Sequence, residues 1–201
     1  MTVVPEPDNI TIQKKELRRH MGQVRQSASD AHAEAGLKLA EQASELLSAH
    51  AAGAVIAGYW PYRSEIDPRA LMSGLQAKGA QLCLPITGAE GTPLSFHHFL
   101  SEAQLVSGKY GILQPSSDSP LMIPDILLVP LLAIDAEGYR LGYGGGYYDR
   151  SLTDLTSAGH RILTIGLAFD EQLLETVPRG AYDVPLDGLA TPTSARWFAA
   201  V

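Results

Sequence analysis

A long apolar run at residues 125–134, followed after a short turn by the glycine-rich segment 140–150, constrains the fold more than any other part of this chain. The run carries apolar side chains at odd and even positions, which is typical of a parallel strand buried on both faces. The glycine-rich segment leads into a pattern that predicts a helix. A strand, a glycine-rich turn and a helix in this order predict a ligand site at the carboxyl end of a parallel strand.

The rest of the chain alternates between strand and helix patterns. We expect helices at 10–27, 30–50, 67–78, 146–157 and 171–177, and strands at 54–60, 81–86, 94–99, 125–134, 161–169 and 188–192. This alternation predicts an α/β fold, in which a mostly parallel, Rossmann-like sheet is flanked by helices. We expect a single layered domain over residues 10–201, preceded by a flexible N-terminal tail at residues 1–9.

The chain's 201 residues suit one domain, and its net charge of −7 argues against a nucleic-acid partner, because such proteins usually carry a basic surplus. Anionic small ligands remain compatible with this charge, since local clusters decide their binding. The single cysteine, Cys83, lies in an apolar strand and is expected to be a buried side chain rather than a nucleophile. There is no signal-peptide pattern and no apolar run of about 18 residues, so we expect a cytoplasmic protein without a membrane partner.

The glycine-rich segment holds four glycines, three tyrosines and two arginines in eleven residues. Glycine lets the backbone approach a ligand and adopt positive φ, and free N–H groups at a helix start favour phosphate. Arg140 and Arg150 add charge suited to phosphate oxygens. No Gly-Lys-Ser/Thr follows the glycines, and Tyr147 stands at the third glycine position of the dinucleotide fingerprint, so neither familiar nucleotide motif matches. The residues alone predict an anion site with aromatic walls; a glycine turn packed by tyrosines is the alternative.

Two stretches around this segment, 129–135 and 138–150, resemble the signature of the 5-formyltetrahydrofolate cyclo-ligases, also called 5,10-methenyltetrahydrofolate synthetases. The chain also resembles the sequences of this family in four further segments, at 59–67, 108–115, 165–172 and 182–187. The resemblance implies a ligase that uses ATP and Mg²⁺ to convert 5-formyltetrahydrofolate to 5,10-methenyltetrahydrofolate. ADP and phosphate would be released, and the intermediate would be a phosphorylated formyl group. The implied partners are these small molecules, and we expect a monomer.

The resemblance also implies the ATP-binding residues. In the family a lysine and an arginine four residues apart near the N-terminus contribute, and Lys14 with Arg18 match that spacing. Lys15 and Arg19 share the spacing, so the register stays open, although a helical wheel places Lys14 and Arg18 nearer the buried stripe. Arg25 lies on the same edge of the predicted helix as Lys14 and Arg18. The alternative interpretation of these three cations is a basic helix face exposed to solvent. The positions implied in the glycine-rich segment are Arg140, Gly142, Tyr143, Gly144, Gly145, Gly146, Tyr147, Tyr148 and Arg150, with Arg140 and Tyr148 as the expected catalytic residues.

Glu65 matches the glutamate with which the family recognises the pterin ring of folate. A carboxylate suits this task because it can accept parallel hydrogen bonds from an amino group and a ring N–H. Trp60 would stack on the ring. The alternatives are core packing for Trp60 and a helix-capping role for Glu65. Lys109 and Tyr110 match a segment that contacts the substrate.

Asp149 and Asp183 match acidic residues expected near Mg²⁺. This ion typically takes one or two carboxylates together with waters and phosphate oxygens. Asp149 is alternatively a helix cap. The chain departs from the family pattern at Leu131, where glycine is common, and at Ile134, where phenylalanine is common. Both changes bear on the shape of the folate pocket.

Two other classes of protein remain open. A folate- or nucleotide-binding protein without turnover would lack charged groups such as Lys14, Arg18 and Glu65, which this chain retains. Another enzyme on the same scaffold, such as a sugar-phosphate isomerase, would need a proton-abstracting carboxylate beside the phosphate loop and would not use ATP. Fold alone does not distinguish these classes.

Overall fold

The computed structural model describes residues 8–198 and has a seven-stranded sheet at its centre. In spatial order the strands are β11 (Ala195–Trp197), β10 (Gly188–Ala190), β9 (Leu163–Leu167), β6 (Ile126–Pro130), β1 (Val55–Ala57), β2 (Gln81–Ile86) and β3 (Ser95–His98). The inner strands pair in parallel, whereas the edge strands β3 and β11 are antiparallel to their neighbours. The predicted α/β fold with a mostly parallel sheet is therefore confirmed.

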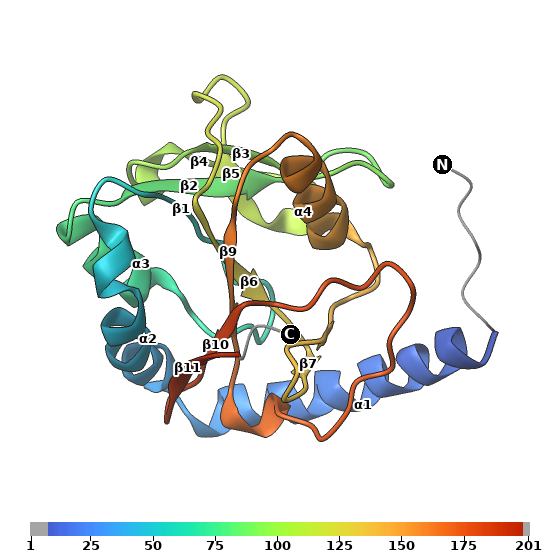
Figure 1. Ribbon diagram of the computed structural model, residues 1–201. Coiled ribbons are helices and arrows are strands. Elements are labelled where there is room, and N and C mark those ends of the chain that lie inside the picture. The colour runs from blue at the N-terminus through green and yellow to red at the C-terminus, as the bar shows by residue number, and fades with distance from the viewer. Residues whose placement is uncertain (1–7, 199–201) are drawn as a thin grey trace.

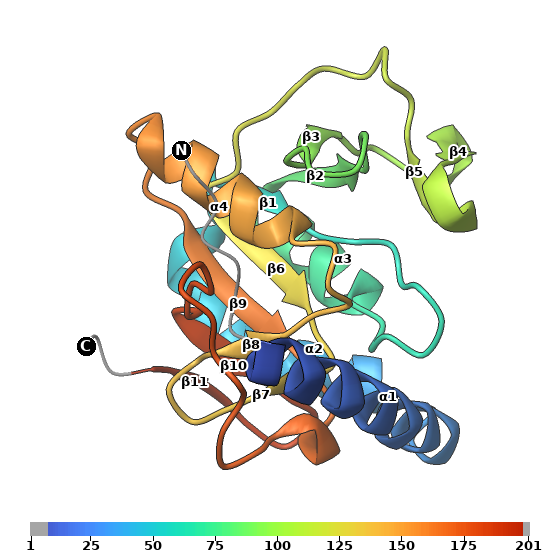
Figure 2. The same ribbon diagram turned by 90° about the vertical axis from the view of Figure 1, so that its right-hand side faces the viewer.

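Helices lie on both faces of this sheet and beneath it (Figures 1 and 2). They are α1 (Asp8–Ala31), α2 (Ala35–Ala51), α3 (Arg69–Ala77) and α4 (Tyr147–Ser157), with 3₁₀ turns η1 (Glu102–Gln104), η2 (Lys109–Gly111) and η3 (Asp170–Gln172). The helices α2 and α3 pack on one face and α4 packs on the other. In α1, Met21 packs against Leu132 and Ala133, which follow β6, so α1 lies at the carboxyl ends of the strands.

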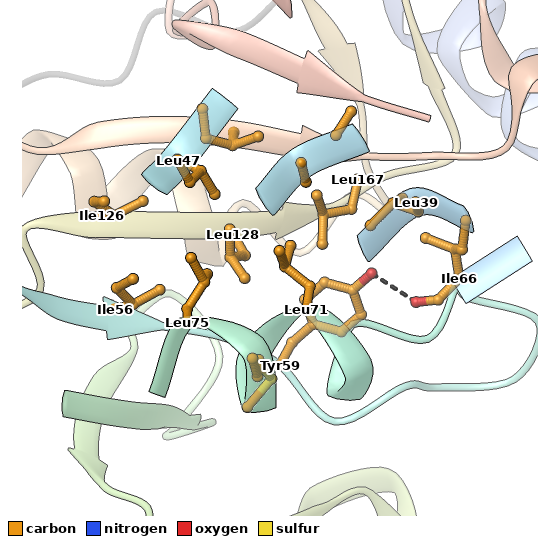
Figure 3. Close-up of a cluster of buried hydrophobic side chains, with 14 of the residues drawn as sticks. Leu39, Leu47, Ile56, Tyr59, Ile66, Leu71, Leu75, Ile126, Leu128 and Leu167 are labelled. Carbon is orange, nitrogen blue, oxygen red and sulfur yellow. Dashed lines mark hydrogen bonds between the residues drawn. The ribbon is translucent and has the colours of Figure 1, made fainter. Parts of the chain in front are cut away.

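Neighbouring residues of the central strand point into different hydrophobic clusters. Leu128 enters the cluster covered by α2 and α3, and Leu127 enters the one covered by α4. Burial on both faces explains the uninterrupted apolar run in this part of the sequence. Figure 3 shows the first cluster, where the Tyr59 hydroxyl donates a 2.8 Å hydrogen bond to the carbonyl of Ile66. This bond closes the segment after β1, which carries Glu65.

The strand predicted at 125–134 is two strands in the structure. After β6, the chain turns away, and β7 (Ala133–Ile134) forms a separate antiparallel pair with β8 (Arg140–Leu141). The carbonyl of Leu131, in the link, accepts a 2.8 Å hydrogen bond from the side chain of Gln172. The apolar pattern did not reveal this break because the residues on both sides of it are buried.

Other boundaries also differ from the prediction. Helix α1 begins two residues earlier than expected, so the end of the predicted tail is helical, and residues 1–7 lie outside the described residues. The helix predicted at 171–177 is only the 3₁₀ turn η3. Edge strand β11 and the hairpin of β4 (Leu105–Ser107) and β5 (Leu113–Pro115) were not predicted. Within residues 8–198 no helix is both long and apolar enough to cross a membrane.

Candidate active site

The glycine-rich loop, residues 142–146, links β8 to the start of α4. Gly144 and Gly146 have φ angles of 97° and 64°, in the left-handed region that other residues seldom adopt. Gly146 is the N-cap of α4, and no side chain among the described residues caps that end. The first N–H groups of a helix lack partners within the helix, and the helix dipole favours an anion there. The loop therefore has the backbone geometry that an anion site requires.

Arg18 of α1 lies against this loop. Its Nε donates a 2.9 Å hydrogen bond to the carbonyl of Gly142. A Cβ at Gly144 would come within 3.1 Å of the Arg18 guanidinium carbon. The close approach of an arginine and a glycine backbone places fixed positive charge beside the loop N–H groups, which favours phosphate.

Lys14 lies one turn before Arg18 and is buried. Its Nζ lies 2.7 Å from Oδ2 of Asp183, which belongs to the segment between η3 and β10. Lys15 and Arg19 are exposed instead. Of the two possible registers, the structure thus brings Lys14 and Arg18 inward.

The predicted phosphate-binding arginines, Arg140 and Arg150, both contact the loop region. Arg140 is buried and donates 2.7 Å hydrogen bonds to the carboxylate of Asp149 and the carbonyl of Val184. The bond to Asp149 ties β8 to the first turn of α4. Arg150 donates to the carbonyl of Gly145. Both arginines therefore fix the shape of the loop as well as adding charge to it.

The predicted magnesium ligands each accept a hydrogen bond from a cation. Asp149 is paired with Arg140, and Asp183 is paired with Lys14 and also accepts a 2.6 Å hydrogen bond from the N–H of Gly180. Across residues 8–198 no three histidine, cysteine or acidic side chains are arranged to hold a metal ion. Since Mg²⁺ needs only one or two carboxylates when phosphate supplies other oxygens, the donor chemistry still suits it. The described chain offers no preformed cage, and these ligands remain a prediction.

Glu65 is the centre of a second group of side chains, after β1. Its Oε2 accepts a 2.9 Å hydrogen bond from the N–H of Tyr62, and its side chain is only 6% exposed. Burial raises the pKa of Glu65 from its ordinary 4.5 to about 7, against the opposing effects of the Tyr62 N–H and the charge of Arg25. Near neutral pH this carboxyl group can therefore change its charge, as acids in ligand sites often do.

Arg25 of α1 contacts two candidate site residues, although the sequence did not predict a site role for it. It is 2% exposed, and its guanidinium lies 3.7 Å from Oε1 of Glu65 and donates to the hydroxyl of Tyr143 in the glycine-rich loop. Arg25 thus joins the carboxylate to the loop. The available signal was its place on the same helix edge as Lys14 and Arg18, but such basic edges are usually solvated.

The other predicted folate contacts lie in two places. Lys109 donates a 3.1 Å hydrogen bond to the hydroxyl of Tyr147, so the η2 segment reaches the start of α4. Its neighbour Tyr110 is exposed and has a φ of 61°. Trp60 packs edge-on against Phe99, with ring centroids 6.5 Å apart, and against the core cluster of α2 and α3. These are the contacts of the core-packing alternative for Trp60.

Tyr148, an expected catalytic residue, packs against the cluster under α4. Burial raises the pKa of its hydroxyl above the ordinary value, and the charge of Glu65 adds to this rise while Arg140 opposes it. Tyr148 therefore stays protonated at neutral pH and is available as a hydrogen-bond donor. The charges of Glu65, after β1, and of Arg140, beside the glycine-rich loop, thus both act on the Tyr148 hydroxyl.

These observations define a class of protein: a parallel α/β domain that gathers a glycine-rich loop, buried cations and a buried carboxylate at the carboxyl ends of its strands, where such sheets bind their ligands. A family model described as the 5-formyltetrahydrofolate cyclo-ligase family matches residues 10–192. The chain belongs to this family, as its signature segments predicted, and is an enzyme of the cyclo-ligase class.

Related proteins agree with this assignment. The 5-formyltetrahydrofolate cyclo-ligase of Escherichia coli strain K12 is 32% identical over 143 residues, which are 69% of this chain and 78% of that protein. The Mycolicibacterium smegmatis cyclo-ligase is 32% identical over 150 residues, or 70% and 74% of the two chains. The solved 5,10-methenyltetrahydrofolate synthetase of Aquifex aeolicus has a TM-score of 0.73 and 30% identity over 94% of both chains. The Mycoplasma pneumoniae synthetase, at 22% identity over 89% and 98%, has a TM-score of 0.70 and bears on the fold alone.

Proposed function

We propose that the protein converts 5-formyltetrahydrofolate to 5,10-methenyltetrahydrofolate while ATP is cleaved to ADP and phosphate. The observation that carries this proposal is the link through Arg25 between two groups of different chemistry. One group, around Gly146 and Arg18, suits a phosphate. The other, around Glu65, suits the amino and ring N–H groups of a heterocycle. A reaction that transfers a phosphoryl group from a nucleotide to a folate needs both groups side by side.

The reaction takes two steps. The formyl oxygen of the folate attacks the γ-phosphorus of ATP, the bond from that phosphorus to the bridging oxygen breaks, and ADP leaves. The folate nitrogen N10 then attacks the activated carbon and loses its proton, and phosphate departs with the former formyl oxygen. Neither step needs a protein nucleophile, so the chain acts by positioning the reactants and neutralising charge.

On the ATP side, Lys14, Arg18 and the loop N–H groups would hold the phosphates. Arg140 is proposed to neutralise charge that develops on the transferred phosphoryl group, and Tyr148 to donate a hydrogen bond to it. Arg150 and the loop tyrosines would line the nucleotide. When bound with ATP, Mg²⁺ supplies further charge neutralisation on the phosphate oxygens, with Asp149 and Asp183 as its proposed protein ligands.

On the folate side, ionised Glu65 would accept hydrogen bonds from the pterin and so orient N5 and N10 toward the nucleotide. Lys109 and Tyr110 would approach from the η2 segment. Trp60 is proposed to stack on the pterin ring, although its contact with Phe99 favours a core-packing role instead. Its substitution is therefore a weaker test than that of Glu65.

The test is an absorbance assay of the purified protein with 5-formyltetrahydrofolate, ATP and Mg²⁺, which follows the methenyl product. We expect product only when ATP is present. A folded protein that gives no ATP-dependent signal would reject the function. Arg140→Ala should mainly impair the use of ATP and Glu65→Ala the use of folate, and the reverse pattern would reject the site assignment.

A further inference from the structure

A cavity of about 690 Å³ lies between the middle of α1, the segment after β1 and the start of the glycine-rich loop. Four of its lining residues are arginines, and none of the described lining residues is acidic: the arginines are Arg18, Arg19, Arg25 and Arg63. The chain as a whole carries a net charge of −7. The cavity is thus a local reversal of charge, and such a concentration of one sign attracts a ligand of the other.

Arg18 and Arg25 donate hydrogen bonds to the glycine-rich loop. Arg19 and Arg63, by contrast, make no ion pair with any acidic side chain of residues 8–198. Both are exposed. Arg63 lies over the ring of Tyr62, 4.9 Å from its centroid, and has a φ of 57°. A left-handed arginine is strained, and strain of this kind is concentrated at ligand-binding segments.

The cavity adjoins the Glu65 group through shared residues. Arg25 and Ser64 line it, and Arg25 is both hydrogen-bonded to Ser64 and 3.7 Å from Glu65. Tyr143 lines it as well and offers an aromatic face. A ligand held at Glu65 can therefore continue into the cavity, where it would meet cations instead of a carboxylate.

We propose that Arg19 and Arg63 form the subsite for the glutamate carboxylates of the folate substrate. The assignment rests on the proposed function, because folate has the matching polarity: hydrogen-bond donors on its pterin and carboxylates at the other end. Guanidinium groups bind carboxylates through two parallel hydrogen bonds. The phosphates of ATP are the other anions that could enter the cavity, and the test below separates the two sources.

The experiment compares two substrates in Arg19→Ala, Arg63→Ala and the double variant. One substrate is 5-formyltetrahydrofolate, and the other is its diamide, in which both glutamate carboxylates are neutral amides of the same size. For the natural substrate we expect KM to rise about two- to fivefold per arginine, as for exposed ion pairs. The ratio of variant to wild-type KM should be larger at low salt, where charges are less screened. The KM for ATP should change less than about twofold, and the three variants should use the diamide as well as wild type does.

Arg161→Ala is the matched control, because Arg161 is an exposed arginine just before β9, at the amino end of the strands. It should leave both KM values unchanged. Equal losses with the natural substrate and the diamide, or a raised KM for ATP with an unchanged KM for folate, would overturn the subsite. If no form turns over either folate, the proposed function fails, and equilibrium binding of 5-formyltetrahydrofolate then tests the subsite alone: weaker binding by the double variant supports it, and equal binding rejects it.

Discussion

The guanidinium of Arg25 lies 3.7 Å from the carboxylate of Glu65, and both side chains are almost completely buried. One comes from α1 and the other from the segment after β1, and Arg25 continues to Tyr143 in the glycine-rich loop. Burying two charges carries a desolvation cost that their attraction offsets only in part. Stability alone therefore does not account for the pair, and the proposed function does, because it places a carboxylate between two substrates.

Replacing Arg25 with methionine should destabilise the protein and weaken the use of both substrates. Without this guanidinium, Glu65 loses its cation, and the Ser64 hydroxyl and the Leu131 carbonyl each lose a hydrogen bond; the loss of one partner from such a buried group costs about 3 kcal/mol. For a domain of this size that corresponds to a fall in melting temperature of about 6–12 °C. Arg25→Lys keeps the charge and should lose less. Thermal unfolding of the two variants checks this, and a methionine variant as stable as wild type would contradict it.

The use of folate should rise with pH. Glu65 has a pKa of about 7 in the folded protein and is proposed to bind the pterin in its ionised form. We expect kcat/KM for 5-formyltetrahydrofolate to increase through a midpoint near pH 7, since this ratio reports groups of the free enzyme. Arg25→Met should move the midpoint upward, because Arg25 lowers the pKa of Glu65. A midpoint unchanged in both Arg25→Met and Glu65→Gln would assign the titration to another group.

Glu65→Gln should stabilise the protein at alkaline pH. The folded-state pKa of about 7 lies above the ordinary 4.5, so the folded state holds this proton more tightly than the unfolded state. The stability of wild type therefore falls between about pH 4.5 and pH 7, by up to about 3 kcal/mol. Urea unfolding should show the glutamine variant to be more stable at about pH 8, with the difference gone near pH 4. A difference that does not depend on pH would refute this account.

The glycines of the loop should differ in their tolerance of alanine. Gly144 has a φ of 97°, and a Cβ there would press on Arg18, whereas a Cβ at Gly142 would meet no atom within 4 Å. Gly144→Ala should therefore cost about 1–2 kcal/mol of stability through backbone strain and raise KM for ATP severalfold. Gly142→Ala is the matched comparison within the same loop; because its Cβ meets no atom and its backbone groups are retained, it should lose less stability and raise KM for ATP less than Gly144→Ala does. Equal effects of the two substitutions would show that loop flexibility, not the Gly144 conformation, matters.

Substitutions of Lys14 and of Asp183 should differ in their effect on the concentration of Mg²⁺ that the enzyme requires. Their side chains are 2.7 Å apart, so either substitution breaks the same ion pair. Lys14→Met should raise KM for ATP and leave the half-saturating concentration of free Mg²⁺ within about twofold of wild type. Asp183→Asn should raise both, if its carboxylate contributes to the metal shell. Should the two variants respond identically to Mg²⁺, Asp183 serves to position Lys14 and is not a metal ligand.

The residues by themselves determined the local features of this protein. The continuous apolar run predicted the central strand β6, although not the break after it, the glycines marked a turn that requires positive φ, and the setting of Cys83 predicted a buried thiol. The structure agrees: Cys83 is fully buried, and burial raises the pKa of its thiol to about 12. Such features depend on a residue and its immediate neighbours, and the period of a pattern reports which face of its own element a residue occupies.

Only the tertiary structure decided which distant groups meet. The sequence left the Lys14 and Lys15 registers open, and their burial separates them. It placed Arg25 on a basic edge but contained nothing that would show the buried carboxylate opposite. The break after β6 was equally hidden, because both strands are buried. The physical reason is the same in each case: pairing across the fold depends on how α1 packs on the carboxyl ends of the sheet, and that packing is set by many weak contacts that no single segment encodes.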